Sequence, residues 1–342
     1  MKKAQLIVVG VLVRAILLSA LPASAAPVAK APEWVRPALR SLVQAGYIDK
    51  DGFQANKPMA RSEFKDLMTA AFDGGFKRTK GEVKAREVDA ALVRALGQAP
   101  TADALADIKS PDGWDPGVGK LFGTEIVARE MGLRRDRPTT EEAFEASAGD
   151  AMTQADIVWS VWKATTAPST YGADALASFQ LSDYSPEVRD VVKFAFSQVG
   201  RPYIWGGEWP TVTPAAYPFG GQPHGGFDCS GFSWFVLRQK DAGWTPPNRP
   251  YTGWALPERS SHDMAQNTKD KVSYKKLSGG DLMFFAPKGT ESKASEVYHV
   301  GVYLGGGWMI DSSGSQAGVS LSEVGPGSWW RDQFIFGRHV VG

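Results

Sequence analysis

Hydrophobic periodicity divides the chain into a helical first part and a strand-rich second part. Apolar residues recur at helical spacing between Trp34 and Val43 and again between Phe64 and Phe72. A weaker pattern of the same kind begins near Trp114 and continues to Trp162. From Pro186 the pattern predicts one more amphipathic helix, which Gly200 ends, and then short strands at 282–286, 298–304, 308–311 and 333–340. Helices followed by antiparallel strands indicate an α+β fold.

The first part contains two copies of a helix–turn–helix unit, at residues 33–75 and 105–165. Met59-Ala60-Arg61-Ser62-Glu63-Phe64 opens the second helix of the first copy, and Met152-Thr153-Gln154-Ala155-Asp156 opens its counterpart. Residues 73–104, rich in Lys, Arg, Glu and Ala, are interpreted as a solvated helix and linker between the copies. A second linker is predicted at 166–185 from its Pro, Ser, Gly, Ala and Asp content.

Charge and the N-terminus restrict the cellular setting. The 342 residues include 38 basic and 37 acidic side chains, a net charge of +1, so nothing favours a nucleic acid as partner. Lys2-Lys3, an apolar stretch over 6–21 and Ala23-Ser24-Ala25 are typical of a secretory signal peptide spanning residues 1–25. The apolar stretch is short of the ~20 residues that span a bilayer, so we expect export without a membrane anchor after cleavage.

Cys229 is the only cysteine, and an exported protein has little reason to keep a free thiol unless it reacts. Gly225-Gly226 breaks the chain before it, Asp228 is a helix-capping residue, and an apolar helix is predicted to start at Ser230. A cysteine in the first turn of a helix lies at the positive end of the helix dipole, which favours the thiolate. The alternative is a buried structural cysteine.

A thiolate nucleophile needs a histidine, and His299 has the most favourable context of the four. It begins a predicted strand in which Val300, Val302 and Leu304 face the core, so the ring lies on the other face. Asp311 ends the next strand and is the candidate that orients the ring. The two share a face if the glycine turn between the strands has an odd number of residues, and a two-residue turn separates them. His224, His262 and His339 are the alternatives. One cysteine and four scattered histidines give no usual metal-ligand spacing, and no cofactor is expected.

Residues 186–342 resemble the NlpC-type family of papain-like cell-wall cysteine peptidases. Four ordered segments carry the resemblance: Gly200 to Gly207, Phe227 to Phe232, Leu277 to Phe285 and His299 to Gly305. The resemblance implies a helix-borne Cys229 as nucleophile packed on an antiparallel sheet, His299 as base, and Asp311 as third polar residue, where the family more often has His, Asn or Gln. It also implies that Tyr203 helps to form the oxyanion site, and that Asp228 and Ser230 bind the amine end of a peptide stem.

Two further segments are interpreted through the same resemblance. The insertion at 208–226, rich in Trp, Pro, Tyr and Gly, is either a surface loop or a cleft wall. The stretch from Gly253 to Ser260 matches the family's Leu-Pro-Arg segment with a one-residue offset, and a structural role is expected for it.

The repeats at 33–165 resemble S-layer homology repeats, whose signature the segment around Arg61 matches; the second copy lacks the arginine. This resemblance implies attachment to a secondary cell-wall polymer, with Arg61 as the candidate contact. A spacer, or a wall that shapes the cleft, is the alternative.

The sequence therefore predicts an exported peptidoglycan hydrolase. The family resemblance points to the peptide stem as substrate and to the bond between γ-D-glutamate and a diamino acid. The alternatives are a wall-binding or S-layer-associated protein with a weak or regulatory catalytic domain, and a thiol acyltransferase.

Overall fold

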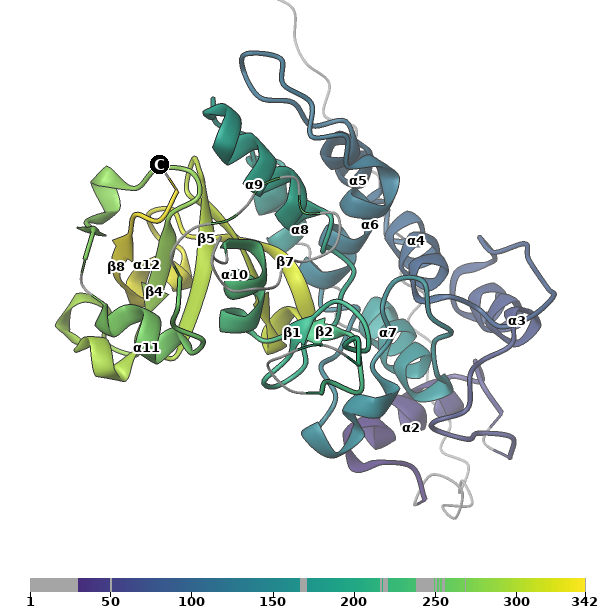
Figure 1. The fold of residues 1–342 in the computed structure, drawn as a ribbon. Helices are drawn as coiled ribbons and strands as arrows, with labels where there is room; N and C mark the ends of the chain where they lie inside the picture. The colour runs from purple at the N-terminus through teal and green to yellow at the C-terminus, as the bar shows by residue number, and fades with distance from the viewer. Residues whose placement is uncertain are drawn as a thin grey trace, which may run out of the picture.

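The computed structural model describes residues 30–49, 51–166, 171–215, 217, 221–237, 249, 251, 253, 256–267 and 269–341, so the predicted signal peptide lies outside the described residues. Two parts lie side by side, a helical half (residues 30–166) and a sheet half (residues 171–341) (Figure 1). Within the described residues, no helix has the length and apolar character needed to cross a bilayer.

The helical half consists of short amphipathic helices that bury one face each. Its main elements are η1 (Glu33–Val35), α2 (Arg36–Gln44), α3 (Arg61–Phe72), α4 (Ala85–Ala95), α5 (Ala99–Ala106), α6 (Gly119–Glu130), η2 (Thr139–Phe144) and α7 (Gln154–Thr166).

A closed ring of backbone hydrogen bonds joins three segments of this half. The N–H of Met59 donates to the Met152 carbonyl at 3.1 Å, that of Val83 to Met59 at 3.0 Å, and that of Met152 to Val83 at 3.0 Å. Each segment leads directly into a helix: Met59 precedes α3, Val83 precedes α4 and Met152 precedes α7. In each of these helices the third residue is acidic, and its carboxylate accepts a hydrogen bond from the residue just before the helix. The structure thus contains three equivalent helix starts, whereas the sequence pattern predicted two copies.

The extra copy lies in the stretch that was interpreted as a solvated helix and linker. This interpretation of residues 73–104 was wrong, because α4 buries Val88, Leu92 and Val93 completely or nearly so. Arg86 and Arg94 are exposed, whereas Asp89 is buried and paired with Arg134, so the charged composition concealed a core helix. The predicted linker at 166–185 is likewise packed where it is described, with α8 (Tyr171–Leu176) and the buried Phe179 covering part of the core.

The sheet half is built on a six-stranded antiparallel sheet of order β3-β8-β4-β5-β6-β7, which confirms the predicted α+β class. The strands are β3 (Lys271–Val272), β4 (Leu282–Phe285), β5 (His299–Gly305), β6 (Trp308–Ser313), β7 (Gly318–Glu323) and β8 (Phe334–Arg338), beside a separate pair, β1 (Glu208–Trp209) and β2 (Gly226–Phe227). The helices are α9 (Pro186–Phe196), α10 (Cys229–Leu237), α11 (Ser261–Gln266) and α12 (Trp329–Gln333). The hydrophobic pattern did not predict β7, because serines alternate with apolar residues along this strand and leave no hydrophobic run.

Helix α10 packs on β5 and β6 (Figure 1). Every residue of this helix is buried. One continuous hydrophobic core extends from α10 and the sheet through α9 into the helical half. Across the junction, the rings of Phe122 on α6 and Phe196 on α9 lie 4.7 Å apart, and α6 contacts β7. The two halves therefore share a core, and the helical half lies close to the end of the sheet that carries the candidate chemistry.

Candidate active site

Cys229 is the first residue of α10, as the sequence predicts. The Asp228 carboxylate caps the helix: its Oδ1 accepts the N–H of Gly231 at 2.5 Å and the hydroxyl of Ser230 at 3.0 Å. The Cys229 backbone N–H lies in the first turn, where helix N–H groups have no partner within the helix. The start of α10 thus presents the Cys229 thiol beside a backbone N–H group that has no partner within the helix.

Close backbone contact fixes the position of this helix start. The N–H of Asp228 donates to the Gly207 carbonyl at 2.9 Å, and a Cβ at Gly231 would lie 1.9 Å from the same oxygen. Only glycine permits this approach, which explains the glycine that follows the cysteine by two positions.

His299 and Asp311 form the second part of the site. The ring Nε2 of His299 lies 2.8 Å from Oδ2 of Asp311, and both residues are buried, with 6% and 0% exposure. The other ring nitrogen, Nδ1, remains for the thiol, and the Cys229 side chain lies near enough to raise the pKa of the ring. The thiol, ring and carboxylate expected from the sequence therefore lie next to one another in that order.

A β-bulge brings Asp311 onto the face of His299. The turn between β5 and β6 has two residues, Gly306 and Gly307, which by simple alternation would separate the two side chains. The register shifts by one between Tyr303 and Gly305, so the extra residue restores the common face. A Cβ at Gly301 would lie 3.1 Å from that of Asp311, so the glycine leaves room for the carboxylate to reach the ring.

The electrostatics favour a charged imidazole ring. Burial lowers the pKa of His299, but the negative Cys229 and the hydrogen bonds to Asp311 and Cys229 outweigh it and raise the pKa to about 10. The Trp330 ring stacks on the imidazole at 4.4 Å between centroids and an angle of 23°, which restricts its orientation. A charged imidazolium ring is thus favoured at neutral pH.

A cavity of ≈ 740 Å³ opens over this pair. It is lined by Cys229 and His299, by Tyr203, and by polar and aromatic side chains that include Asp228, Ser230, Ser313, Trp205, Tyr298, Trp329 and Trp330. Tyr203, Asp228 and Ser230 are the residues for which the family resemblance implies contact with the substrate. No sequence pattern pointed to the aromatic side chains of Trp205 and Trp329, which are 71% and 62% exposed.

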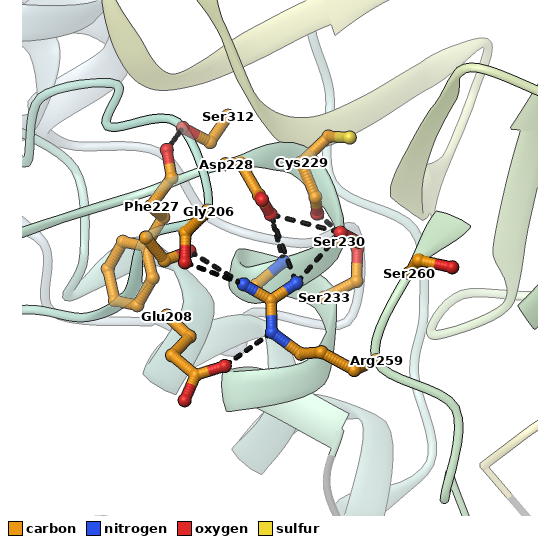
Figure 2. A network of polar contacts seen from close by, with 12 residues as sticks. Gly206, Glu208, Phe227, Asp228, Cys229, Ser230, Ser233, Arg259, Ser260 and Ser312 are labelled. Carbon is orange, nitrogen blue, oxygen red and sulfur yellow. Dashed lines mark hydrogen bonds and ion pairs between the residues drawn. The ribbon is translucent and has the colours of Figure 1, made fainter. Parts of the chain in front are cut away.

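Arg259 is a second group whose place the sequence did not reveal. Figure 2 shows its guanidinium inside the loop that precedes α10. It donates to the Ser230 hydroxyl at 2.9 Å, to Asp228 Oδ1 at 3.3 Å and to the Gly206 carbonyl at 3.0 Å, and its Nε pairs with Glu208. Glu208 lies in the insertion at 208–226, so the arginine joins this insertion to the helix start. The structural role expected for this stretch agrees with these contacts.

The helical half reaches the same cleft. The backbone N–H of Trp205 donates to Glu142 at 3.0 Å, and a Cβ at Gly314, which lines the cavity, would lie 2.9 Å from the Asp136 carboxylate. Burial and the neighbouring Glu142 raise the pKa of Asp136 to about 7, against the attraction of Arg135.

The remaining candidates lie elsewhere. His224, His262 and His339 are not among the residues that line the cavity. Arg61 lies in the helical half, where its guanidinium pairs with Glu87 at 2.8 Å and donates to the Lys80 carbonyl at 2.8 Å. It therefore links two of the three helix starts, and its contact with a wall polymer stays a prediction.

Comparisons with known proteins match the part of the chain that contains this site. The NlpC/P60 family pattern matches residues 200–338. The chain is 32% identical to peptidoglycan endopeptidase RipB of Mycobacterium tuberculosis over 240 residues, which cover 67% of this chain and 85% of RipB. It is 36% identical to the bifunctional muramidase/DL-endopeptidase CwlT of Bacillus subtilis over 151 residues, 43% of this chain and 35% of CwlT.

The family pattern lies within the sheet half, whereas the match to RipB is longer than that half. The chain spans only 21–35% of the length of the first curated relatives. A solved structure of RipB is similar at 27% identity and a TM-score of 0.32, covering 46% of this chain and 65% of that one. The matched residues 200–338 include the thiol, the ring and the carboxylate described above.

Proposed function

The chain belongs to the NlpC/P60 family, and from that premise we propose that it is an exported cysteine endopeptidase that hydrolyses an amide bond in the peptide stem of peptidoglycan. The observation that carries the proposal is the series Cys229–His299–Asp311, in which the thiol and the ring line one open cavity and the buried carboxylate holds the ring from behind. This series supplies a nucleophile, a proton carrier and a group that orients the carrier.

In the first half of the reaction, the Cys229 sulfur forms a bond to the amide carbon, and the electron pair of the C=O moves to oxygen. The backbone N–H of Cys229 and the Tyr203 hydroxyl are the donors that would stabilise this oxyanion. The intermediate then collapses: the C–N bond breaks, His299 Nδ1 gives its proton to the departing amine, and a thioester remains.

In the second half, neutral His299 takes a proton from water as the water oxygen attacks the thioester carbon. The C–S bond breaks, and the thiolate and imidazolium are restored together. Asp311 holds Nε2 throughout and favours the charged ring over the neutral one. No other group is needed for the proton balance.

The bond proposed for cleavage is that between γ-D-glutamate and the diamino acid. Support comes from the family resemblance and from the DL-endopeptidase named for CwlT. For the helical half, the contacts of Glu142 and Asp136 at the cleft favour the shaping of the cleft over anchoring to a secondary polymer.

Digestion of purified sacculi with mass analysis of the released peptides tests the proposal. We expect products with a new free amine on the diamino acid and a carboxyl on γ-D-glutamate, and no such products from Cys229→Ala. Products in which the acyl group is joined to an added amine, with no hydrolysis, would instead identify an acyltransferase. Pelleting with sacculi without any released peptide would support a wall-binding protein.

A further inference from the structure

A buried arginine of the helical half reaches into the turn that borders the cleft. Arg129 lies at the end of α6 and is 1% exposed. Its Nη1 donates to the Gln316 carbonyl at 3.1 Å and also to the Ala317 carbonyl, while Nη2 pairs with Glu125 at 3.3 Å. These bonds cross from the helical half to the turn between β6 and β7.

The same turn holds Tyr203. The backbone N–H of Tyr203 donates to the Ala317 carbonyl at 3.3 Å, so that oxygen is shared between Tyr203 and Arg129. The packing is tight: a Cβ at Gly318 would lie 2.7 Å from Arg129 Nη1 and 2.1 Å from the Arg201 carbonyl. The arginine, the turn and the backbone of Tyr203 thus form one hydrogen-bonded, closely packed unit.

The next residue of α6 holds the side chain of the same turn. Glu130 accepts a hydrogen bond from Gln316 Nε2, and Gln316 Oε1 accepts the hydroxyl of Ser313 at 3.1 Å. Ser313 lines the cavity two residues after Asp311. A second path therefore leads from α6 to the cleft wall.

We propose that Arg129 and Glu130 are positioning residues for the peptidase reaction: by holding the Gly314–Ala317 turn, they set the place of Tyr203 and Ser313 in the cleft. The helical half would then be a working part of the peptidase and not a separable attachment. The inference rests on the proposed function, and in particular on Tyr203 as an oxyanion donor.

A small displacement suffices for a measurable effect. An oxyanion donor acts at about 2.7–3.1 Å from the developing charge, and a misplacement of about 1 Å costs on the order of 10²-fold in rate. Lysine at position 129 would keep the positive charge near Glu125, but a single ammonium cannot reproduce the planar fork toward two carbonyls and a carboxylate. A partial loss is therefore expected from Arg129→Lys.

A double-mutant cycle in the full chain tests whether Arg129 acts through Tyr203. The variants are Arg129→Lys, Tyr203→Phe and the two together, with kcat and KM measured on muropeptides and thermal unfolding measured for each. Arg134→Lys is the matched control, because Arg134 is also buried but pairs with Asp89 and the Ala146 carbonyl, inside the helical half.

In the wild-type background we expect Arg129→Lys to lower kcat about tenfold and to change KM less than about twofold. In the Tyr203→Phe background the same substitution should lower kcat by less than about twofold. Arg134→Lys should leave kcat unchanged in the folded protein. If Arg129→Lys does not fold, Glu130→Ala replaces it in the same cycle with Ser313→Ala, and the same non-additivity is expected.

Equal losses of kcat with and without the Tyr203 hydroxyl, or an unchanged kcat for Arg129→Lys, would overturn the inference alone. With Glu130→Ala, losses that add to those of Ser313→Ala would do the same. A wild-type protein that releases no peptide from sacculi would instead overturn the proposed function itself, so the two failures are distinguishable.

Discussion

The two halves of the molecule both raise the pKa of buried groups, with opposite consequences for charge. In the sheet half, neighbouring Cys229 and Asp311 raise the pKa of His299 to about 10, which keeps the ring charged. In the helical half, burial and the nearby Asp156 raise the pKa of Glu145 to about 8, which keeps the carboxyl neutral. Glu130, at the junction, behaves as Glu145 does, with a pKa raised to about 8 by burial.

The difference lies in the partners. His299 faces groups of opposite charge at hydrogen-bond distance, so its charge is stabilised despite burial. Glu145 faces another carboxylate and has mainly a backbone N–H of Arg137 to offset its burial. A raised pKa points to a reactive group only where that group has an oppositely charged partner and borders an open cavity, as His299 does. For a buried carboxyl such as Glu145, the raised pKa reflects the unfavourable burial of its charged form.

The largest expected effect is the loss of the nucleophile. Cys229→Ala should lower peptide release from sacculi by at least about 10³-fold, because no other group in the cleft replaces the thiolate. Circular dichroism should show an unchanged fold, since alanine fits at the start of α10. Near wild-type turnover of the alanine protein would refute thiolate catalysis.

Removal of the carboxylate charge should have the next largest effect. We expect Asp311→Asn to lower kcat about 10²-fold and Asp311→Ala to lower it further, because an amide can still accept from Nε2 but lacks the charge that favours the imidazolium. The control is Asp103→Asn, on α5 in the helical half, where the carboxylate is exposed. Equal activity of the wild type and the Asp311→Ala protein would exclude the orienting role.

The neutral carboxyls of the helical half predict a pH dependence of stability. A carboxyl whose folded pKa lies above its unfolded value of about 4.5 binds more protons when folded. Its contribution to stability is therefore complete below pH ~4.5 and is lost as pH rises toward about 8.

Thermal unfolding between pH 5 and 8 measures this loss. Each such group lowers the free energy of unfolding by at most about 1.4 kcal/mol per pH unit. Glu145→Gln should flatten the dependence of the unfolding free energy on pH, because an amide does not titrate. The amide oxygen can still accept the hydrogen bond from the Arg137 N–H, so the fold should be kept. A slope that is the same in wild type and Glu145→Gln would contradict the pKa assigned to this carboxyl.

The charged ring of the sheet half predicts an alkaline limit of activity. Loss of the His299 proton as pH rises through about 10 removes the acid that serves the departing amine, so kcat/KM should fall there. Histidine NMR in Cys229→Ala should show a lower pKa for His299, because the negative neighbour is gone. An unchanged titration in that variant would mean that the thiol does not contact the ring.

The smallest expected effect concerns Arg61. If the helical half also binds a wall polymer, Arg61→Ala should weaken pelleting with purified walls by a few-fold at most, since its guanidinium is already engaged by Glu87. Arg40→Ala serves as the control for loss of one positive charge. Pelleting that is identical for both variants and the wild type would remove the polymer contact from Arg61.

Local patterns supplied most of the candidate groups that the structure brings together. The single cysteine between a glycine break and an apolar helix, and the strand that begins at His299, are signals contained in a few adjacent residues. The strands β4, β5, β6 and β8 followed from alternation in the same way. Asp311 came from its position after the next strand together with the family resemblance.

Tertiary structure decided what depends on distant contacts. The bulge before Gly305, and not the length of the turn, places Asp311 on the face of His299. The third helix start at Val83 is recognised only through its backbone bonds to Met59 and Met152, because its sequence resembles a solvated charged segment. In the sequence, nothing distinguishes Arg129 from a residue on the surface of a helix. Its buried contact with the Ala317 carbonyl arises only because α6 packs against β7. The sequence thus predicted the candidate reactive groups, which local backbone preferences carry. Their alignment depends on contacts that range from 12 residues apart, between His299 and Asp311, to 188 residues apart, between Arg129 and Ala317, and no local pattern contains the energies of those contacts.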